Sequence, residues 1–118
     1  MVFKFENLKI WKIAREFASE IYEITRNFPK DELFGLTSQL RRAAVSVVLN
    51  IAEGSNRKSD LEFKRFLNIA RSSLDEVITG LFIANDQKFI DKNTLNKLYT
   101  QADSLASKIT ALTNKLKN

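Results

Sequence analysis

Apolar residues recur at intervals of three and four along almost the whole chain, and this spacing constrains the fold more than any other feature. In an α-helix such spacing places apolar side chains on one face. The longest repeats are Ile10, Ala14, Phe17, Ile21, Ile24 and Phe28; Phe63, Leu67, Ala70, Leu74, Val77, Leu81 and Ala84; and Leu95, Leu98, Ala102, Leu105, Ile109, Leu112 and Leu116. The spacing predicts long amphipathic helices, the first from about Asn7 to Asn27.

Breaks between the periodic segments are few, because the chain has only three glycines and one proline. They lie at Phe28-Pro29, Gly35, Gly54 and residues 85–91, and they divide the chain into four helices with short connections. Short connections place consecutive helices antiparallel, and a repeat near 3.5 residues favours shallow crossing angles. The sequence therefore predicts one all-α domain over residues 1–118, an antiparallel up-down-up-down four-helix bundle.

Two local signals refine the third helix. Ser59 is followed three residues later by Glu62, the capping-box pattern in which each side chain bonds the backbone amide of the other residue. Gly80 falls on the core side of the same helix, where glycine costs about 1 kcal/mol relative to alanine. We expect the helix to begin after Ser59 and two helices to approach closely at Gly80.

The second helix, from Leu36 to Gly54, has an unusual distribution of polar residues. We expect Thr37 to be its N-cap and Gly54 to lie just past its end. Its polar stripe consists of Gln39, Arg42, Ser46, Asn50 and Glu53, with Arg57 beyond it. Nearly all of the remaining arc is apolar, whereas a single core covers only about 100–150° of a helix. We therefore expect a second chain to cover part of this arc, with Val45, Val48 and Ile51 in an apolar seam.

The polar stripe allows two interpretations. It is either structural, as a solvent face or a buried network joining Arg42, Asn50, Glu53 and Arg57 across helices, or functional. In the functional case it lines a subunit interface or an anion site, where arginine can bind phosphate or carboxylate through two hydrogen bonds. The sequence leaves both interpretations open.

The same region carries a family resemblance. The run FGLTSQLRRAAVSV from Phe34 to Val47, followed by NIAEG from Asn50 to Gly54 and by Arg57, resembles the signature of bacterial four-helix bundle proteins encoded in intervening sequences of large-subunit ribosomal RNA genes. Leu8, Trp11, Phe28-Pro29 and Phe66-Leu67 extend the resemblance over almost the whole chain. Val48 stands where many members have proline, so we expect a weaker kink there or none.

The resemblance implies a small helical subunit that assembles into a ring, usually a pentamer. It extends to the accessory variability proteins of diversity-generating retroelements, which are basic bundles that bind nucleic acid and a reverse transcriptase. A homo-oligomer is therefore expected, with RNA or a reverse-transcriptase-like protein as a further partner.

Lysine and arginine outnumber aspartate and glutamate by 19 to 14, which gives a net charge of +5. The charge is +2 over residues 1–30, +1 over 31–58, −1 over 59–90 and +3 over 91–118, so the excess is spread along the chain. The residues predicted to bind nucleic acid are Arg57, Lys58, Lys64, Arg65, Lys108 and Lys115. Neither a glycine-rich RNA-binding signature nor a stripe of exposed aromatic residues is recognisable. We therefore expect phosphate contacts with little base readout.

The chain has no histidine and no cysteine, which excludes disulfides, cysteine-bearing zinc sites, thiol nucleophiles and an imidazole base. Because it also has no glycine-rich phosphate loop and no paired-carboxylate motif, we expect no catalysis, no cofactor and no metal. The absence of a signal-peptide pattern and of an apolar run near 20 residues predicts a cytoplasmic protein without membrane contact.

Two further hypotheses concern partners. A helix-turn-helix over residues 53–60 is disfavoured, because the flanking helices are too long and too apolar for that motif. The main alternative to RNA binding is a protein-interaction scaffold, a ring that holds a partner and whose basic charge is incidental.

Overall fold

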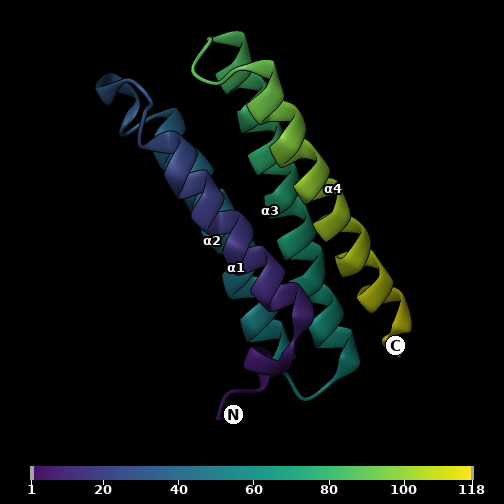
Figure 1. Ribbon diagram of the computed structural model, residues 1–118. Coiled ribbons are helices and arrows are strands. Elements are labelled where there is room, and N and C mark those ends of the chain that lie inside the picture. The colour runs from purple at the N-terminus through teal and green to yellow at the C-terminus, as the bar shows by residue number, and fades with distance from the viewer. Residues whose placement is uncertain (1, 118) are drawn as a thin grey trace.

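The computed structural model describes residues 2–117, and this part of the chain folds into four long helices and two short 3-10 segments (Figure 1). The elements in order are η1 (Lys4–Asn7), α1 (Lys9–Thr25), η2 (Lys30–Glu32), α2 (Leu36–Ser55), α3 (Asp60–Asp86) and α4 (Lys92–Lys115). No strand occurs within residues 2–117. The predicted all-α fold is confirmed.

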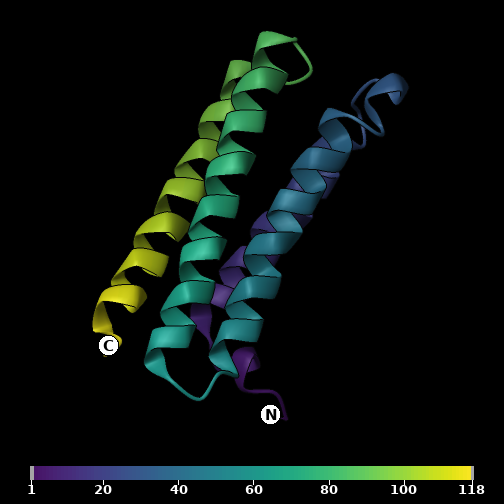
Figure 2. The same ribbon diagram turned by 180° about the vertical axis from the view of Figure 1, so that it is seen from behind.

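Each helix packs against the next one in the chain, and α4 returns to contact α1. The ribbon views from the front and the back place α1 and α4 on one side of the molecule and α2 and α3 on the other (Figures 1 and 2). Because the connections are short, neighbouring helices run antiparallel. The result is a bundle of 43 × 24 × 21 Å with up-down-up-down topology.

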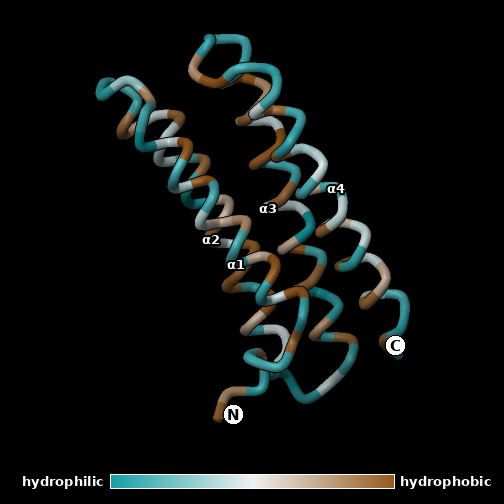
Figure 3. The backbone as a smooth tube through the Cα atoms, viewed as in Figure 1, coloured by the Kyte–Doolittle hydropathy of each residue, from teal (hydrophilic) through white to brown (hydrophobic). Residues whose placement is uncertain are grey.

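Apolar residues from all four helices fill the space between them, and the hydropathy colouring shows hydrophobic stretches along every helix (Figure 3). The largest fully buried side chains include Ile21 of α1, Leu40 of α2, Leu74 and Leu81 of α3 and Leu105 of α4. Four of them, Ile21, Leu74, Leu81 and Leu105, occupy positions of the repeats given above, and Leu40 has the same spacing, four residues after Leu36 and three before Ala43. Burying a side chain of this size contributes roughly 1.5–3 kcal/mol, so the repeat accounts for most of the packing that holds the helices together.

The start of α2 differs from the sequence prediction, in which Thr37 was the N-cap. The helix begins two residues earlier, at Leu36 with Gly35 as its N-cap, and Thr37 is buried inside it. The backbone amide of Leu36, which has no acceptor within the helix, donates to the Glu32 side chain at 2.9 Å. A carboxylate from the preceding turn therefore supplies the acceptor that an N-cap side chain normally provides.

The end of α2 also differs, because Gly54 lies inside the helix and the last helical residue is Ser55. Gly54 does not have a positive φ, so it is not the left-handed residue that ends many helices. A Cβ atom at this position would lie 2.6 Å from the Cβ of Phe66 on α3. Glycine is therefore required here by a close approach of two helices.

The prediction at Gly80 is confirmed, because a Cβ atom there would lie 2.6 Å from a methyl group of Leu40 on α2. The Ser59 half of the predicted capping box forms, with the Ser59 hydroxyl accepting a hydrogen bond from the Glu62 amide at 3.2 Å. The first helix is shorter than predicted: it spans Lys9–Thr25, and Asn7 belongs to η1. Within residues 2–117, no helix combines the length and the apolar character that crossing a bilayer requires.

Candidate nucleic-acid interface

Both chain ends and the α2–α3 turn lie at the same end of the bundle (Figure 1). We call this half the turn end and define it as residues 2–17, 46–72 and 103–117; the remainder is the opposite end. The turn end carries twelve of the 19 lysines and arginines but only six of the 14 aspartates and glutamates. The opposite end carries seven and eight. The basic excess, spread along the sequence, is therefore concentrated at one end of the fold.

The structure brings all six predicted nucleic-acid-binding residues to the turn end. Arg57 and Lys58 lie in the α2–α3 turn, Lys64 and Arg65 in the first turns of α3, and Lys108 and Lys115 in the last third of α4. The side chains of Lys58, Arg65 and Lys115 are exposed, whereas those of Lys64 and Lys108 are partly buried. The backbone amide of Lys117 donates to Asp60 at 2.9 Å and holds the end of α4 beside the start of α3.

Arg57 and Lys108 have intramolecular partners that hold their side chains in place. The Arg57 guanidinium donates to the Glu53 carboxylate at 2.7 Å and lies 4.7 Å from the centroid of the Phe66 ring. The Lys108 ammonium donates to the Ser104 hydroxyl at 2.9 Å. Because the Arg57–Glu53 pair is exposed, it is worth little energetically, and Arg57 keeps further N–H donors for a ligand.

The predicted polar stripe is only partly a network. The hydroxyls of Ser46 on α2 and Ser73 on α3 lie 2.8 Å apart, and the Asn50 side-chain amide donates to the Ser46 carbonyl at 2.8 Å. The Ser46–Ser73 bond joins α2 to α3, whereas the Asn50 bond stays within α2. The predicted network of Arg42, Asn50, Glu53 and Arg57 across helices does not form, because the Glu53–Arg57 pair also stays within one turn of chain. Arg42 is exposed.

A groove of about 740 Å³ runs along the outer side of α2 and is lined by Arg42, Ser46, Asn50 and Glu53 of the stripe. The fifth stripe residue, Gln39, lines a separate hollow of about 370 Å³ between α2 and α3. At the α1 edge of the groove, Arg41 donates to the Thr25 hydroxyl at 2.9 Å and stacks 4.7 Å from the Tyr22 ring centroid. The two neighbouring arginines thus differ: Arg41 is held in place and Arg42 is free to meet a ligand or partner.

The predicted apolar seam is wrong at Ile51 and has to be revised at Val48. Ile51 is completely buried in the core of its own subunit, because it shares the inward face of α2 with Leu40, Ala44 and Val47. Val48 is partly buried and packs against that core. Only Val45 lines the outer groove. Most of the wide apolar arc is therefore covered by α1 and α3 of the same chain, not by a second chain.

The exposed apolar residues on this side were missed by the sequence prediction. Leu49 is 60% exposed, Phe34 is 93% exposed and Leu33 is 49% exposed, and all three line the outer groove with Val45. We call Leu33, Phe34, Val45 and Leu49 the α2 face. The signal that could have found Leu49 is its spacing, four residues after Val45 and four before Glu53, which places it on the outward side of the helix.

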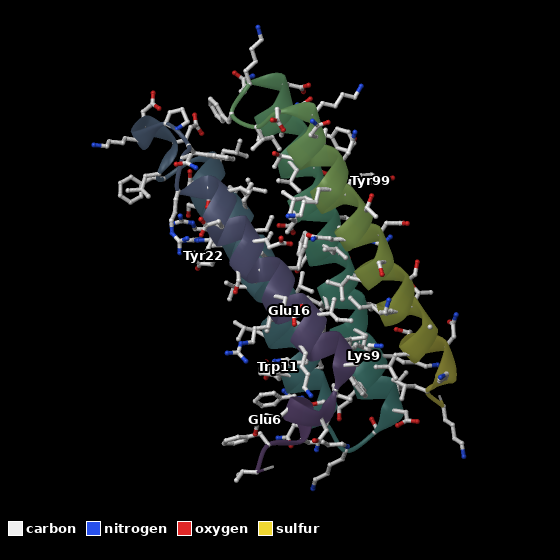
Figure 4. All side chains as sticks on the ribbon, viewed as in Figure 1. Glu6, Lys9, Trp11, Glu16, Tyr22 and Tyr99 are labelled. Atoms are coloured by element: carbon white, nitrogen blue, oxygen red, sulfur yellow. The ribbon has the colours of Figure 1, made fainter. Side chains whose placement is uncertain are left out.

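The N-terminal segment carries an aromatic cluster that the sequence analysis did not predict, and Phe3 is its one exposed ring. The rings of Phe3 and Phe5 are stacked with centroids 5.7 Å apart, and Phe5 contacts Trp11 with centroids 4.8 Å apart. Trp11 is labelled in Figure 4, close to η1 at the turn end. Sequence periodicity does not detect this cluster, because Phe3 and Phe5 precede the first α-helix.

Within residues 2–117, no group of three or more acidic side chains is placed to hold a metal ion. The acidic residues of α1, Glu16, Glu20 and Glu23, lie on its outer side, where Glu20 pairs with Lys97 of α4 at 3.3 Å. The acidic face of α1 therefore contributes an ion pair between helices at the opposite end.

The sequence pattern of the family described as 23S rRNA-intervening sequence protein matches residues 6–111. The chain belongs to this family. The fold agrees with a crystal structure from Bacteroides thetaiotaomicron, described as a protein with unknown function from the S23 ribosomal protein family. The two chains share 20% identity with a TM-score of 0.79, over 88% of this chain and 97% of the other. Comparison with curated proteins finds no match.

In this chain, the signature run from Phe34 to Gly54 covers nearly all of α2 and supplies contacts that this helix makes with its neighbours. Ala43, Ala44 and Val47 are buried in the core, Ser46 bonds α3, and Gly54 allows the close approach to Phe66. The helix continues without interruption through Val48. Much of the family signature in this chain therefore holds α2 in place, while Phe34, Arg42 and Glu53 remain on the surface.

Proposed function

We propose that this chain is a non-enzymatic nucleic-acid-binding protein that contacts the phosphates of RNA with its turn end. The observation that supports this proposal is the concentration of twelve lysines and arginines against six acidic residues in that half of the bundle. A surface of this kind attracts a polyanion and releases its counterions. RNA is the favoured polyanion because the family description names a 23S rRNA intervening sequence.

The experiment measures RNA affinity by fluorescence anisotropy, with a labelled RNA hairpin, as the salt concentration rises from about 50 to about 200 mM. The test variant replaces three exposed turn-end residues by glutamine: Lys58→Gln, Arg65→Gln and Lys115→Gln. The matched control removes the same charge at the opposite end: Lys30→Gln, Lys88→Gln and Lys92→Gln. The test and control variants have equal net charge, so they differ only in the position of the removed charges.

We expect the turn-end variant to bind about tenfold or more weakly and its salt slope to fall by about two to three, roughly one for each lost phosphate contact. The control should bind within about threefold of the wild type. Equal losses in the two variants would assign binding to net charge alone. Absence of binding by the wild type at about 50 mM salt would refute the proposal.

A second candidate activity is self-association, which the α2 face favours. Leu49, Leu33 and Phe34 are exposed beside one another along a groove, and the largest exposed apolar patch of a protein is often an interaction surface. We propose that a second copy covers this face and that the contact closes into a ring, with five subunits as the family resemblance implies. A ring would multiply the basic charge of each turn end.

Light scattering after size-exclusion chromatography tests the assembly, and a single species of 13.5 kDa at micromolar concentration would contradict it. Leu49→Asp should lower the assembled mass, because it places a charge in the interface. Leu61→Asp is the control, since Leu61 is 47% exposed on α3, outside the α2 face. Val48 is unsuitable for this test because its side chain packs against the core of the subunit.

The two candidate activities are separable. A protein that assembles but binds no RNA at low salt would be a protein-interaction scaffold, whose basic charge is incidental. A protein that binds RNA as a monomer would leave the α2 face for a different partner. The two measurements above therefore distinguish the nucleic-acid-binding function from the scaffold function.

A further inference from the structure

The N-terminal segment forms a ladder of aromatic rings that ends at a cation. Phe3 stacks on Phe5 with an interplanar angle of 18°, Phe5 contacts Trp11, and the Arg15 guanidinium lies 5.4 Å from the Trp11 ring centroid. We call Phe3, Phe5 and Trp11 the aromatic ladder. Phe5 and Trp11 are half-buried, whereas Phe3 is 59% exposed. The outermost ring therefore has surface available for another planar group.

The exposed ring is held in place by local contacts. The Glu6 carboxylate accepts a hydrogen bond from the backbone amide of Phe3 at 3.1 Å, and η1 fixes the chain between Phe3 and α1. Trp11 anchors the ladder, because its ring packs against the core. A ligand that stacks on Phe3 therefore meets a partly ordered surface, which lowers the entropy cost of binding.

A hollow of about 670 Å³ lies beside the ladder, between η1 and the end of α2. Phe3 and Phe5 form its aromatic wall, and Lys4, Asn56 and Arg57 supply polar groups. Its acidic lining residue, Glu53, is already paired with Arg57. The volume is typical of small-ligand sites, and the Asn56 amide can both donate to and accept from the edge of a base.

We propose that the aromatic ladder and this hollow bind an unpaired base of single-stranded RNA. The base stacks on the exposed side of Phe3, and Lys4 and Arg57 meet the flanking phosphates. Base–aromatic stacking beside a basic surface is the usual means of binding single strands without sequence preference. The site rests on the proposed RNA-binding function and adds to it a preference for single strands over duplexes, which phosphate contacts alone do not provide.

The opposite end offers a natural control. Phe82 and Tyr99 also form an exposed aromatic pair, with centroids 6.2 Å apart, but their rings meet edge to face at 76°. Acidic residues outnumber basic ones by eight to seven in that half of the bundle. Aromatic exposure is therefore similar at the two ends, whereas only the turn end combines it with positive charge.

The experiment compares Phe3→Ala with Phe82→Ala, using a labelled twelve-nucleotide oligouridine and a blunt twelve-base-pair RNA duplex. We expect Phe3→Ala to weaken oligouridine binding about five- to tenfold and to leave duplex binding within about twofold. Phe82→Ala should leave both affinities within about twofold of the wild type. Phe3→Trp keeps an aromatic ring at this position and should bind oligouridine as the wild type does. Because Phe3 and Phe82 are both exposed, far-UV circular dichroism should show an intact helical fold for each variant.

The outcomes separate this site from the proposed function. If Phe3→Ala leaves oligouridine binding unchanged while the triple glutamine variant weakens both probes, the ladder is not a base-binding site and the phosphate-binding function stands. If the wild type binds neither probe, the proposed function fails with it. A fall in assembled mass on Phe3→Ala, without a selective loss of oligouridine binding, would assign the ladder to contacts between copies and overturn the inference.

Discussion

The two ends of the bundle have the same architectural parts but different charge. Each end has a close approach of α2 to α3 at a glycine, an N-capped helix start and an aromatic pair with at least one exposed ring. The turn end has twice as many basic as acidic residues, whereas the opposite end has seven basic and eight acidic ones. Shared architecture with unequal charge indicates that the asymmetry is a surface property and is not required by the packing.

The cause of the asymmetry is the antiparallel topology. Residues near the start of α1, the end of α2, the start of α3 and the end of α4 meet at one end, although they are far apart in sequence. A charge count by consecutive segments averages over both ends of each helix and so hides the excess. The last helix illustrates this: Lys92 and Lys97 lie at the opposite end, and Lys108, Lys115 and Lys117 lie at the turn end.

The largest expected difference between the ends concerns the two close approaches. Gly54→Ala would place a Cβ atom 2.6 Å from the Phe66 Cβ and 2.9 Å from the Phe63 ring. Because the Phe66 Cβ is attached directly to the backbone of α3, the helix itself must move. Overpacking of this kind costs about 1–3 kcal/mol, and only about 1 kcal/mol is recovered from helix propensity. Urea unfolding followed by circular dichroism measures the change.

Gly80→Ala is the matched substitution at the opposite end. Its Cβ would also lie at 2.6 Å, but from a terminal methyl group of Leu40, which can move by rotation of its side chain. We expect the strain and the gain in propensity to cancel within about 1 kcal/mol. Equal destabilisation by the two substitutions would show that α2 and α3 are packed with equal rigidity at both ends.

The sequence was sufficient for the parts of the fold that follow from periodicity. The three-and-four spacing identified core residues such as Leu74, Leu81 and Leu105, and breaker positions separated the four helices. Gly80 was interpreted correctly because it lies in the middle of a periodic segment. Gly54 was misinterpreted because it lies near a helix end, where a terminating glycine and a close approach have the same sequence pattern.

The candidate site was less predictable because it depends on contacts between segments. The wide apolar arc of α2 indicated an interface. Which part of this arc is covered depends on how the other helices of the same chain pack against α2. In this fold Ile51 is buried and Leu49 is exposed. Likewise, the aromatic ladder depends on how η1 folds back beside Trp11. The six predicted basic residues all lie at the turn end, and their role in binding nucleic acid stays a prediction.

A smaller effect is expected at the N-cap of the turn end. Ser59→Ala removes the acceptor for the Glu62 amide and should lower the free energy of unfolding by about 1 kcal/mol. Ser59→Asp keeps an acceptor at the same position and should remain close to the wild type in the same urea measurement. If Ser59→Ala is as stable as the wild type, solvent satisfies the start of α3 and the cap contributes no net stability.

The smallest effect is expected at the corresponding cap of the opposite end, where the acceptor is titratable. The Asp91 carboxylate accepts a hydrogen bond from the Thr94 amide at 2.8 Å, and this bond, with one from the Thr94 side chain, lowers the pKa of Asp91 below its ordinary value of 3.8. Because the pKa of Asp91 is lower in the folded chain, the unfolded chain binds more protons. The cap therefore stabilises the fold at pH values above the ordinary pKa, and this stability is lost as the pH falls through the folded pKa.

Asp91→Asn keeps a capping oxygen without the titration. Stability measured between about pH 5 and about pH 3 should therefore fall less steeply in Asp91→Asn than in the wild type, whereas Ser59→Ala should leave that slope unchanged. Parallel slopes for Asp91→Asn and the wild type would mean that the Asp91 carboxylate takes up its proton at the same pH in the folded and unfolded chains. The two caps would then differ only in residue type.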